Sequence, residues 1–255
     1  MARPLLAIGG IALIGVGVLT GLGWWWPSDA EATAELTQSI KSVRVENDEG
    51  AVKITTGSGP AKVHQEFSYR WNKPGDAYRM DGDVLVLAGC GTSCEVDYDV
   101  VVPAGIPVTG KVDSGAVEIA GMSTVDITVD SGRVEVRDVP GTVKVKAGSG
   151  RVELKNIGQD VDVHASSGAI KGERLGGNVE ARANSGRIEL ELIKGSDVTA
   201  RSDSGSIEVT VPSGDYNVTG TTDSGHREIG VNQSGSAPHK LDLNTDSGSV
   251  KVNAA

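Results

Sequence analysis

Apolar and polar residues alternate along most of the chain after residue 110, and the alternation occurs twice in each unit of about 18 residues. In residues 131–148 the apolar positions of the two runs are Val134, Val136, Val143, Val145 and Ala147. Alternation with a period of two is typical of a strand with one buried face and one face in water. The pattern therefore predicts two short strands in each unit.

The dipeptide Ser-Gly marks these units. Its glycines are 17 to 23 residues apart, at Gly115, Gly132, Gly150, Gly168, Gly186, Gly205, Gly225 and Gly248. Self-similar units of this length stack on one another, with neighbouring strands about 4.8 Å apart. The expected fold class is all-β, a parallel β-solenoid (β-helix) of two-strand coils of about 18 residues, over residues 111–255.

Residues 39–110 alternate in the same way but without the repeat, and we expect them to form an N-terminal β cap region. They contain five of the nine aromatic residues, namely Phe67, Tyr69, Trp71, Tyr78 and Tyr98. Bulky side chains can cover the open apolar end of a stack. The alternative is an aromatic platform that binds a glycan or a peptide.

The N-terminal stretch from Leu5 to Trp26 has no charged side chain and is long enough to span a bilayer core of roughly 30 Å. Trp24, Trp25 and Trp26 end it, as an interfacial aromatic belt would. We expect residues 1–27 to be a single-pass membrane anchor, residues 28–38 a linker, and the C-terminal domain to lie outside the cell. The alternative is a secreted protein, cleaved from its signal at residues 30–32.

The chain carries a formal charge of −10, and Arg3 is the only charged side chain before residue 27, so residues 27–255 carry −11. Such a charge repels nucleic acid, which we exclude as a partner. An unknown envelope or extracellular partner remains, besides the membrane contact of residues 5–26.

Cys90 and Cys94 are the only cysteines, and in an exported protein a pair four residues apart indicates a disulfide that shapes a tight loop. A zinc site would need two further ligands nearby, so we expect no metal and no cofactor.

An aspartate precedes Ser-Gly in five units, at Asp113, Asp130, Asp203, Asp223 and Asp246. A catalytic serine would need a histidine base, and none of the four histidines repeats with the motif. The motif indicates a turn, in which the acid caps backbone amides and glycine supplies a positive φ.

Charged side chains recur on the outward faces. Glu135 and Glu153 share one phase, and Arg133 and Arg151 lie two positions before them. A mixed, solvated surface is one interpretation, and weak binding of calcium is another. The chain ends with a strand-like run at Lys251–Asn253, which predicts an open edge and possible end-to-end self-association.

Four features together resemble the bacterial putative-adhesin family, also catalogued as a domain of unknown function. They are the predicted anchor of an exported protein, residues 45–54, the step Val100–Pro103 into the repeats, and the SG-x-V-E-V repeats. The resemblance covers roughly residues 40–253 and implies a β-helix at the cell surface, with adhesion an inferred label and no catalytic residues. We expect a non-enzymatic binding or scaffold protein. The alternatives are a carbohydrate-active β-helix enzyme and a self-assembling envelope scaffold.

Overall fold

The computed structural model describes residues 27–255, so the predicted membrane anchor lies outside the described residues. Within the described range, no helix has the length and apolar character needed to cross a membrane. The secondary structure of this range is nineteen strands: β1 (Ser28–Leu36), β2 (Ser42–Glu49), β3 (Val52–Thr56), β4 (Ala61–Tyr69), β5 (Tyr78–Asp81), β6 (Val84–Ala88), β7 (Cys94–Val102), β8 (Val108–Ala120), β9 (Val125–Val139), β10 (Val143–Ile157), β11 (Val161–Leu175), β12 (Val179–Ser185), β13 (Ile188–Leu192), β14 (Val198–Ser204), β15 (Ile207–Val211), β16 (Asp215–Thr219), β17 (Thr222–Ile229), β18 (Asn232–Gln233) and β19 (Lys240–Ala254).

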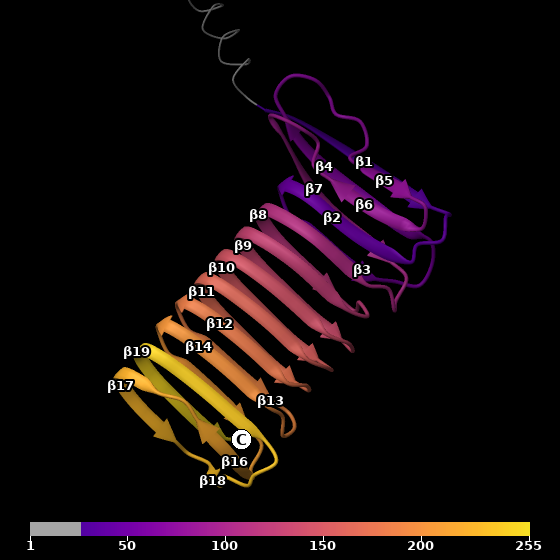
Figure 1. The fold of residues 1–255 in the computed structure, drawn as a ribbon. Coiled ribbons are helices and arrows are strands. Elements are labelled where there is room, and N and C mark those ends of the chain that lie inside the picture. The colour runs from indigo at the N-terminus through magenta and orange to yellow at the C-terminus, as the bar shows by residue number, and fades with distance from the viewer. Residues whose placement is uncertain (1–26) are drawn as a thin grey trace, which may run out of the picture.

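The middle of the molecule is a stack of parallel coils, as the repeat predicts (Figure 1). β10 pairs with β9 and β11 in a register offset by 18 residues, so that Val145 lies between Ile127 and Val163. Each coil bends at its Ser-Gly. We call residues before the bend, such as 143–147, the first side, and residues after it, such as 151–157, the second side.

The core runs through the stack between the two sides. In β10 the inward residues are Val143, Val145, Ala147, Val152, Leu154 and Ile157, all buried. Full burial of one such aliphatic side chain contributes about 1.5–3 kcal/mol, and each packs on its equivalent in the next coil. The apolar ladder therefore continues from coil to coil.

Glycine is required at the Ser-Gly bend because the coils approach most closely there. A Cβ on Gly150 would lie 1.7 Å from the carbonyl oxygen of Gly132, and φ of Gly150 is +121°. The predicted positive φ is confirmed, but the predicted aspartate caps are wrong. Within residues 27–255 none of those five carboxylates accepts a hydrogen bond from a backbone amide, since they face outward; Asp113 and Asp130, for example, pair with Lys111.

The C-terminal strand is enclosed, so the predicted open edge at Lys251–Asn253 is wrong. β19 pairs with β14 and β15 on one flank and with β16 and β17 on the other. A Cβ on Gly248 would meet the oxygen of Gly205, and one on Gly225 would meet the oxygen of Gly248. The order of coils in space thus differs from their order in the sequence, and β17 forms the edge.

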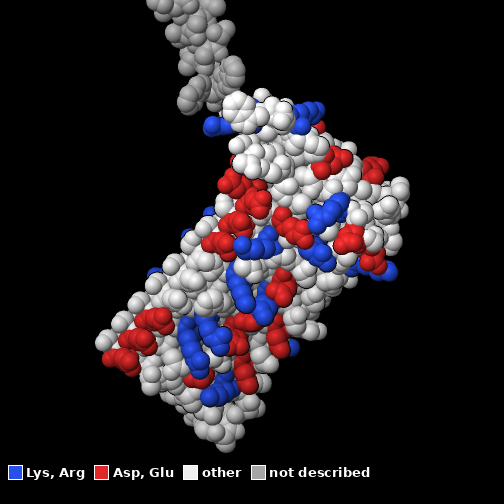
Figure 2. Space-filling view, turned by 45° about the horizontal axis from the view of Figure 1, so that its top comes forward, with Lys and Arg blue, Asp and Glu red and all other residues white. Residues whose placement is uncertain are grey.

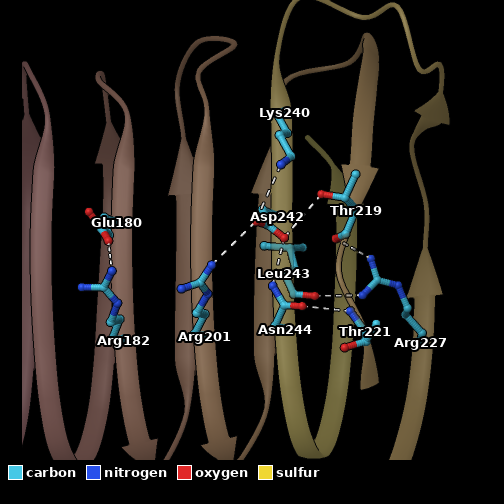
Figure 3. A network of polar contacts seen from close by, with 10 residues as sticks. All are labelled: Glu180, Arg182, Arg201, Thr219, Thr221, Arg227, Lys240, Asp242, Leu243 and Asn244. Carbon is cyan, nitrogen blue, oxygen red and sulfur yellow. Dashed lines mark hydrogen bonds and ion pairs between the residues drawn. The ribbon is translucent and has the colours of Figure 1, made fainter. Parts of the chain in front are cut away.

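Arg227 of β17 closes this end. It is paired with Val250, so it occupies an inward position that is filled by an apolar residue in the coils in the middle of the stack. Its guanidinium donates hydrogen bonds to the carbonyl oxygens of Leu243 and Thr219, each at 3.0 Å (Figure 3). An inward-pointing charge of this kind discourages further strand pairing at an edge.

The N-terminal end also encloses its first coil. β2 and β3 lie between β8 on one flank and β6 and β7 on the other. β4 pairs antiparallel with β7, and β5 with β6. These added strands close the stack, while β2 and β3 belong to it.

The expected linker at residues 28–38 is wrong for most of its length. β1 pairs antiparallel with β4 from Ser28 opposite Tyr69 to Leu36 opposite Ala61. Ala30, Ala32 and Leu36 pack against the core on alternate positions. Small alanines at every second position carry a weak hydrophobic signal, and for this reason the sequence did not show the strand.

Candidate functional site

The five aromatic residues of the cap region do not form one exposed platform. Phe67 and Tyr98 are 4% and 2% exposed, because they occupy inward positions of β4 and β7. The Tyr98 hydroxyl donates to the carbonyl oxygen of Ala88 at 2.6 Å, and burial raises the pKa of Tyr98. Tyr69 and Tyr78 are half-buried, and burial also raises the pKa of Tyr78. Only Trp71 is largely exposed, at 68%.

A disulfide joins Cys90 and Cys94, with their Cα atoms 5.6 Å apart. It closes the loop between β6 and β7. The backbone amide of Arg70 donates to the carbonyl oxygen of Ser93, so this loop lies against the start of the loop that carries Trp71. The disulfide therefore shapes one end of the molecule.

The second side carries the predicted glutamate and arginine rows. Glu135 and Glu153 are in register with each other, as are Arg133 and Arg151. Arg151 Nη1 lies 3.4 Å from Glu153 Oε1. The acidic row is therefore neutralised within the surface, as expected of a mixed solvated face.

Arg137 contributes to this neutralisation and was missed in the sequence. Its Nη2 lies 2.5 Å from Glu118 Oε1 and its Nε lies 3.7 Å from Glu135 Oε1. The hydrogen bond to Glu118 raises the pKa of Arg137. Arg137 lies on the second side, two positions after the glutamate row. Its position in the repeat is the sequence signal that could have identified it.

The first side carries a row that sequence reasoning also missed, which we call the cation row after its charged members Lys146, Arg182 and Arg201. In the parallel register its members follow one another as Lys146, His164, Arg182 and Arg201. Each lies four positions before a Ser-Gly glycine, so the phase was visible, but the residue type changes along the row. Lys146, Arg182 and Arg201 are exposed.

Acidic residues flank this cation row. Arg182 pairs with Glu180, and Arg201 lies 4.0 Å from Asp242 (Figure 3). Asp242 also accepts hydrogen bonds from Thr219 at 3.4 Å and Asn244 at 2.9 Å. Asp242 thus links the enclosed strand β19, on which it lies, to Arg201 of β14 and Thr219 of β16. Among the ion pairs of residues 27–255, none involves Lys146, so its charge is available to a ligand.

A hollow of about 520 Å³ lies on the first side, beside the turns that open each coil. Its polar lining includes a chain of backbone caps. The amide of Asn178 donates to Asp160 Oδ1 at 2.9 Å, that of Asp197 to Asn178 Oδ1 at 3.1 Å, and that of Lys240 to Asp197 Oδ1 at 3.0 Å. These side chains accept hydrogen bonds from backbone amides at the turn that opens each coil. The sequence analysis expected such caps at the Ser-Gly bend instead.

Two carboxyl groups of the described chain, those of Asp83 and Glu173, have a lowered pKa. Ion pairing with Lys41 lowers the pKa of Asp83, and ion pairing with Lys171 lowers that of Glu173, whereas a general acid needs a raised pKa. Within residues 27–255 no three His, Cys, Asp or Glu side chains gather closely enough to hold a metal ion.

Two of the four histidines have polar partners other than serine. His64 lies 2.8 Å from the Thr33 hydroxyl and 3.2 Å from Glu66, and His239 lies 3.7 Å from Asp197. A serine nucleophile needs a base within hydrogen-bond reach. No hydrogen bond joins a histidine to a serine within residues 27–255, although His226 is paired with Ser249 in the strand register.

Comparison with known proteins gives a family and a fold. A family model described as Toastrack DUF4097 matches residues 99–253. A "putative adhesin" of Bacteroides fragilis has a solved structure that is 14% identical, with a TM-score of 0.50 and coverage of 88% of this chain and 97% of that one. A "putative adhesin" of Parabacteroides distasonis is 12% identical, with a TM-score of 0.49 and coverage of 88% and 97%. No curated protein matches the chain. At these identities the likeness to the Bacteroides fragilis structure shows the fold alone.

Proposed function

The chain belongs to the Toastrack family DUF4097, and from this premise we propose that it is a non-enzymatic, adhesin-like binding or scaffold protein of the bacterial envelope. In this proposal residues 5–26 anchor the chain in the cell membrane as a single span, and the solenoid lies outside. The name of the Bacteroides fragilis protein, whose fold is similar, agrees with such a role.

The cation row of the first side is the observation that carries the proposal. Lys146, His164, Arg182 and Arg201 follow one another at the coil spacing of about 4.8 Å. A row of this kind suits an extended polymer that lies along the stack, rather than a small molecule, which binds in a concave pocket that buries most of its surface. The ligand class is a linear anionic polymer of the envelope, such as an acidic polysaccharide.

The overall negative charge of the domain does not prevent this contact. At physiological ionic strength the Debye length is about 8 Å, so a ligand on the first side experiences mainly the charges of that side. Binding to such a row should weaken as salt increases.

A screen against envelope polysaccharides tests the proposal, with binding and release of products measured together. The first-side variant Lys146→Ser/Arg182→Ser should lose most of the binding to an acidic polysaccharide, because it removes the unpaired Lys146 together with the next cation of the row. The second-side variant Arg151→Ser/Arg187→Ser is the matched control, since it removes the same charge, and it should bind normally. Equal loss in both variants would contradict the choice of the first side.

The alternative function is a carbohydrate-active enzyme on a β-helix. Release of shortened sugar products in the screen would favour it and would contradict the non-enzymatic role. Flotation of the full-length protein with vesicles, and its resistance to extraction at alkaline pH, test the anchor. A protein that stays with the soluble fraction would contradict the anchor and favour the secreted form.

A further inference from the structure

We propose that the loop Arg70–Lys73 is a second membrane contact, which docks the N-terminal end of the solenoid on the surface of an anionic bilayer. The inference rests on the proposed function, because it takes residues 5–26 to be the membrane anchor. Residues 70–73 open the loop 70–77, which joins β4 to β5, and they include the exposed Trp71. The partner is the lipid surface itself, contacted through Trp71 and the two cations of the loop.

The strand register places this loop where the chain leaves the predicted anchor. Ser28, at the start of β1, is paired with Tyr69, and Tyr69 is paired with Cys94 at the start of β7. We call the end formed by Ser28, residues 70–73 and the loop 90–94 the tip. Figure 1 shows the β4–β5 loop beside the start of β1. A chain that enters a bilayer just before Ser28 therefore brings the tip to the bilayer surface.

The chemistry of the tip fits the interface of a membrane. Tryptophan is enriched at the level of the lipid headgroups, where its ring is partly in apolar and partly in polar surroundings. Trp71 is 68% exposed, whereas the other large apolar side chain exposed in residues 27–255, Ile193, is a single residue further along the stack. The exposed Arg70 and Lys73 flank Trp71. Each cation near an anionic surface favours docking by about 5-fold.

The tip carries charges of both signs, cations in the loop and carboxylates on the adjoining strands. Asp76, in the same loop, lies 3.5 Å from the buried Gln65 and so points toward the body of the domain. Asp29 and Glu95 lie one position from Ser28 and Cys94, whereas Glu31, Glu66 and Asp97 lie opposite one another further along β1, β4 and β7. Figure 2 shows blue and white atoms at the end where the described chain begins, with most red atoms further away. Arg70 and Lys73 lie in the loop beyond the strand ends, whereas the nearest carboxylates, Asp29 and Glu95, lie on the strands themselves.

Fluorescence of Trp71 in the full-length protein tests the contact. Replacing Trp24, Trp25 and Trp26 with phenylalanine leaves Trp71 as the single tryptophan of the chain. The protein is reconstituted in vesicles of phosphatidylcholine and phosphatidylglycerol whose acyl chains carry bromine near the headgroups. Trp71 emission should be quenched and shifted to shorter wavelength, and added salt should reverse both changes.

The control carries the tryptophan elsewhere on the same domain. In the same background, Trp71→Phe with Ile193→Trp moves the probe six coils along the stack, about 29 Å at 4.8 Å per coil, and its emission should be unquenched. The variant Arg70→Glu/Lys73→Glu should reduce quenching of Trp71.

Two results would overturn the inference, and they are distinguishable. If the protein floats with the vesicles but Trp71 is quenched no more than the probe at position 193, the anchor stands and the contact is wrong. If the protein does not float with the vesicles, the anchor is wrong and the contact falls with it.

Discussion

At the N-terminal end of the stack, β1, β4 and β5 add antiparallel strands outside the parallel coils and bring Phe67 and Tyr98 into the core. At the C-terminal end no antiparallel strand is added within the described chain, and the inward Arg227 of β17 covers the last coil. Both ends nevertheless enclose one coil, β2 with β3 or β19, between segments distant in the sequence. The comparison shows that the apolar end of a stack can be covered either by additional strands or by one inward-pointing arginine.

Removing a large side chain from each enclosed region should give the largest effects. Leu87 of β6 and Leu243 of β19 are fully buried, so Leu87→Ala and Leu243→Ala should each lower the free energy of unfolding by about 3 kcal/mol. Ile229 of the edge strand β17 is half-buried, and Ile229→Ala should cost only about 1 kcal/mol. Urea denaturation of residues 27–255 measures the three values. A cost for Ile229→Ala equal to that for Leu243→Ala would contradict the edge position of β17.

The disulfide should stabilise the N-terminal end alone. Its loop spans only four positions, so in the chain-entropy model Cys90→Ser/Cys94→Ser should lower stability by about 2 kcal/mol. Hydrogen exchange should become faster in β6 and β7 and stay unchanged in β16 and β17. Faster exchange at both ends would show that the ends are coupled through the stack.

One buried tyrosine hydroxyl at each end forms a matched pair. Tyr98 donates to Ala88, and Tyr216 donates to the carbonyl oxygen of Pro212 at 2.9 Å. Tyr98→Phe and Tyr216→Phe should each cost about 1 kcal/mol at pH 7, because a carbonyl oxygen loses its donor. Urea denaturation at neutral pH measures this cost.

The same pair predicts the response to alkali. Burial raises the pKa of both Tyr98 and Tyr216 in the fold, whereas tyrosine in an unfolded chain ionises near pH 10. Deprotonation therefore favours the unfolded chain, and stability that is complete below pH 10 should fall as pH rises above it. Each phenylalanine variant should show a shallower fall above pH 10. A fall as steep as in the wild type would contradict the assignment to these residues.

The smallest effect on stability, and the sharpest test of the comparison, is expected for Arg227→Val. The substitution removes two hydrogen bonds, but it places an apolar side chain at the inward position beside Val250. Sedimentation at increasing concentration should show association of the variant through β17, while the wild type should not associate at this edge. A variant that sediments like the wild type would show that Arg227 is not what protects the edge.

The middle of the fold was predictable because its pattern of apolar and polar residues repeats over the short length of one coil. The phase of residues 131–148 repeats within one coil, so inward and outward rows could be read from the chain. The order of the last two coils was not predictable from the period, because residues 217–229 and 240–254 both carry Asp-Ser-Gly. The difference lies in the inward phase, where β19 has Leu241, Leu243, Val250 and Val252 and β17 has Arg227.

The candidate surfaces were predicted only in part. The rows of Glu135 and Arg151 were predicted from their positions in the repeat. The cation row could have been predicted in the same way if side-chain charge, instead of residue type, had been compared between coils. The burial of Phe67 could not be read in this way. It depends on β1 pairing with β4, and the alanines of β1 gave little indication of a strand.

The position of β19 also bears on export. In the proposed topology the chain crosses the membrane from its N-terminal end, so β16 and β17 leave the translocation channel before β19 does. Yet β19 must lie between them and the coil of β14 and β15. The last coils therefore cannot be laid down one after another as the chain emerges. In that topology residues 212–239 emerge before the strand that joins β16 and β17 to the stack, and the stack is complete only when β19 arrives.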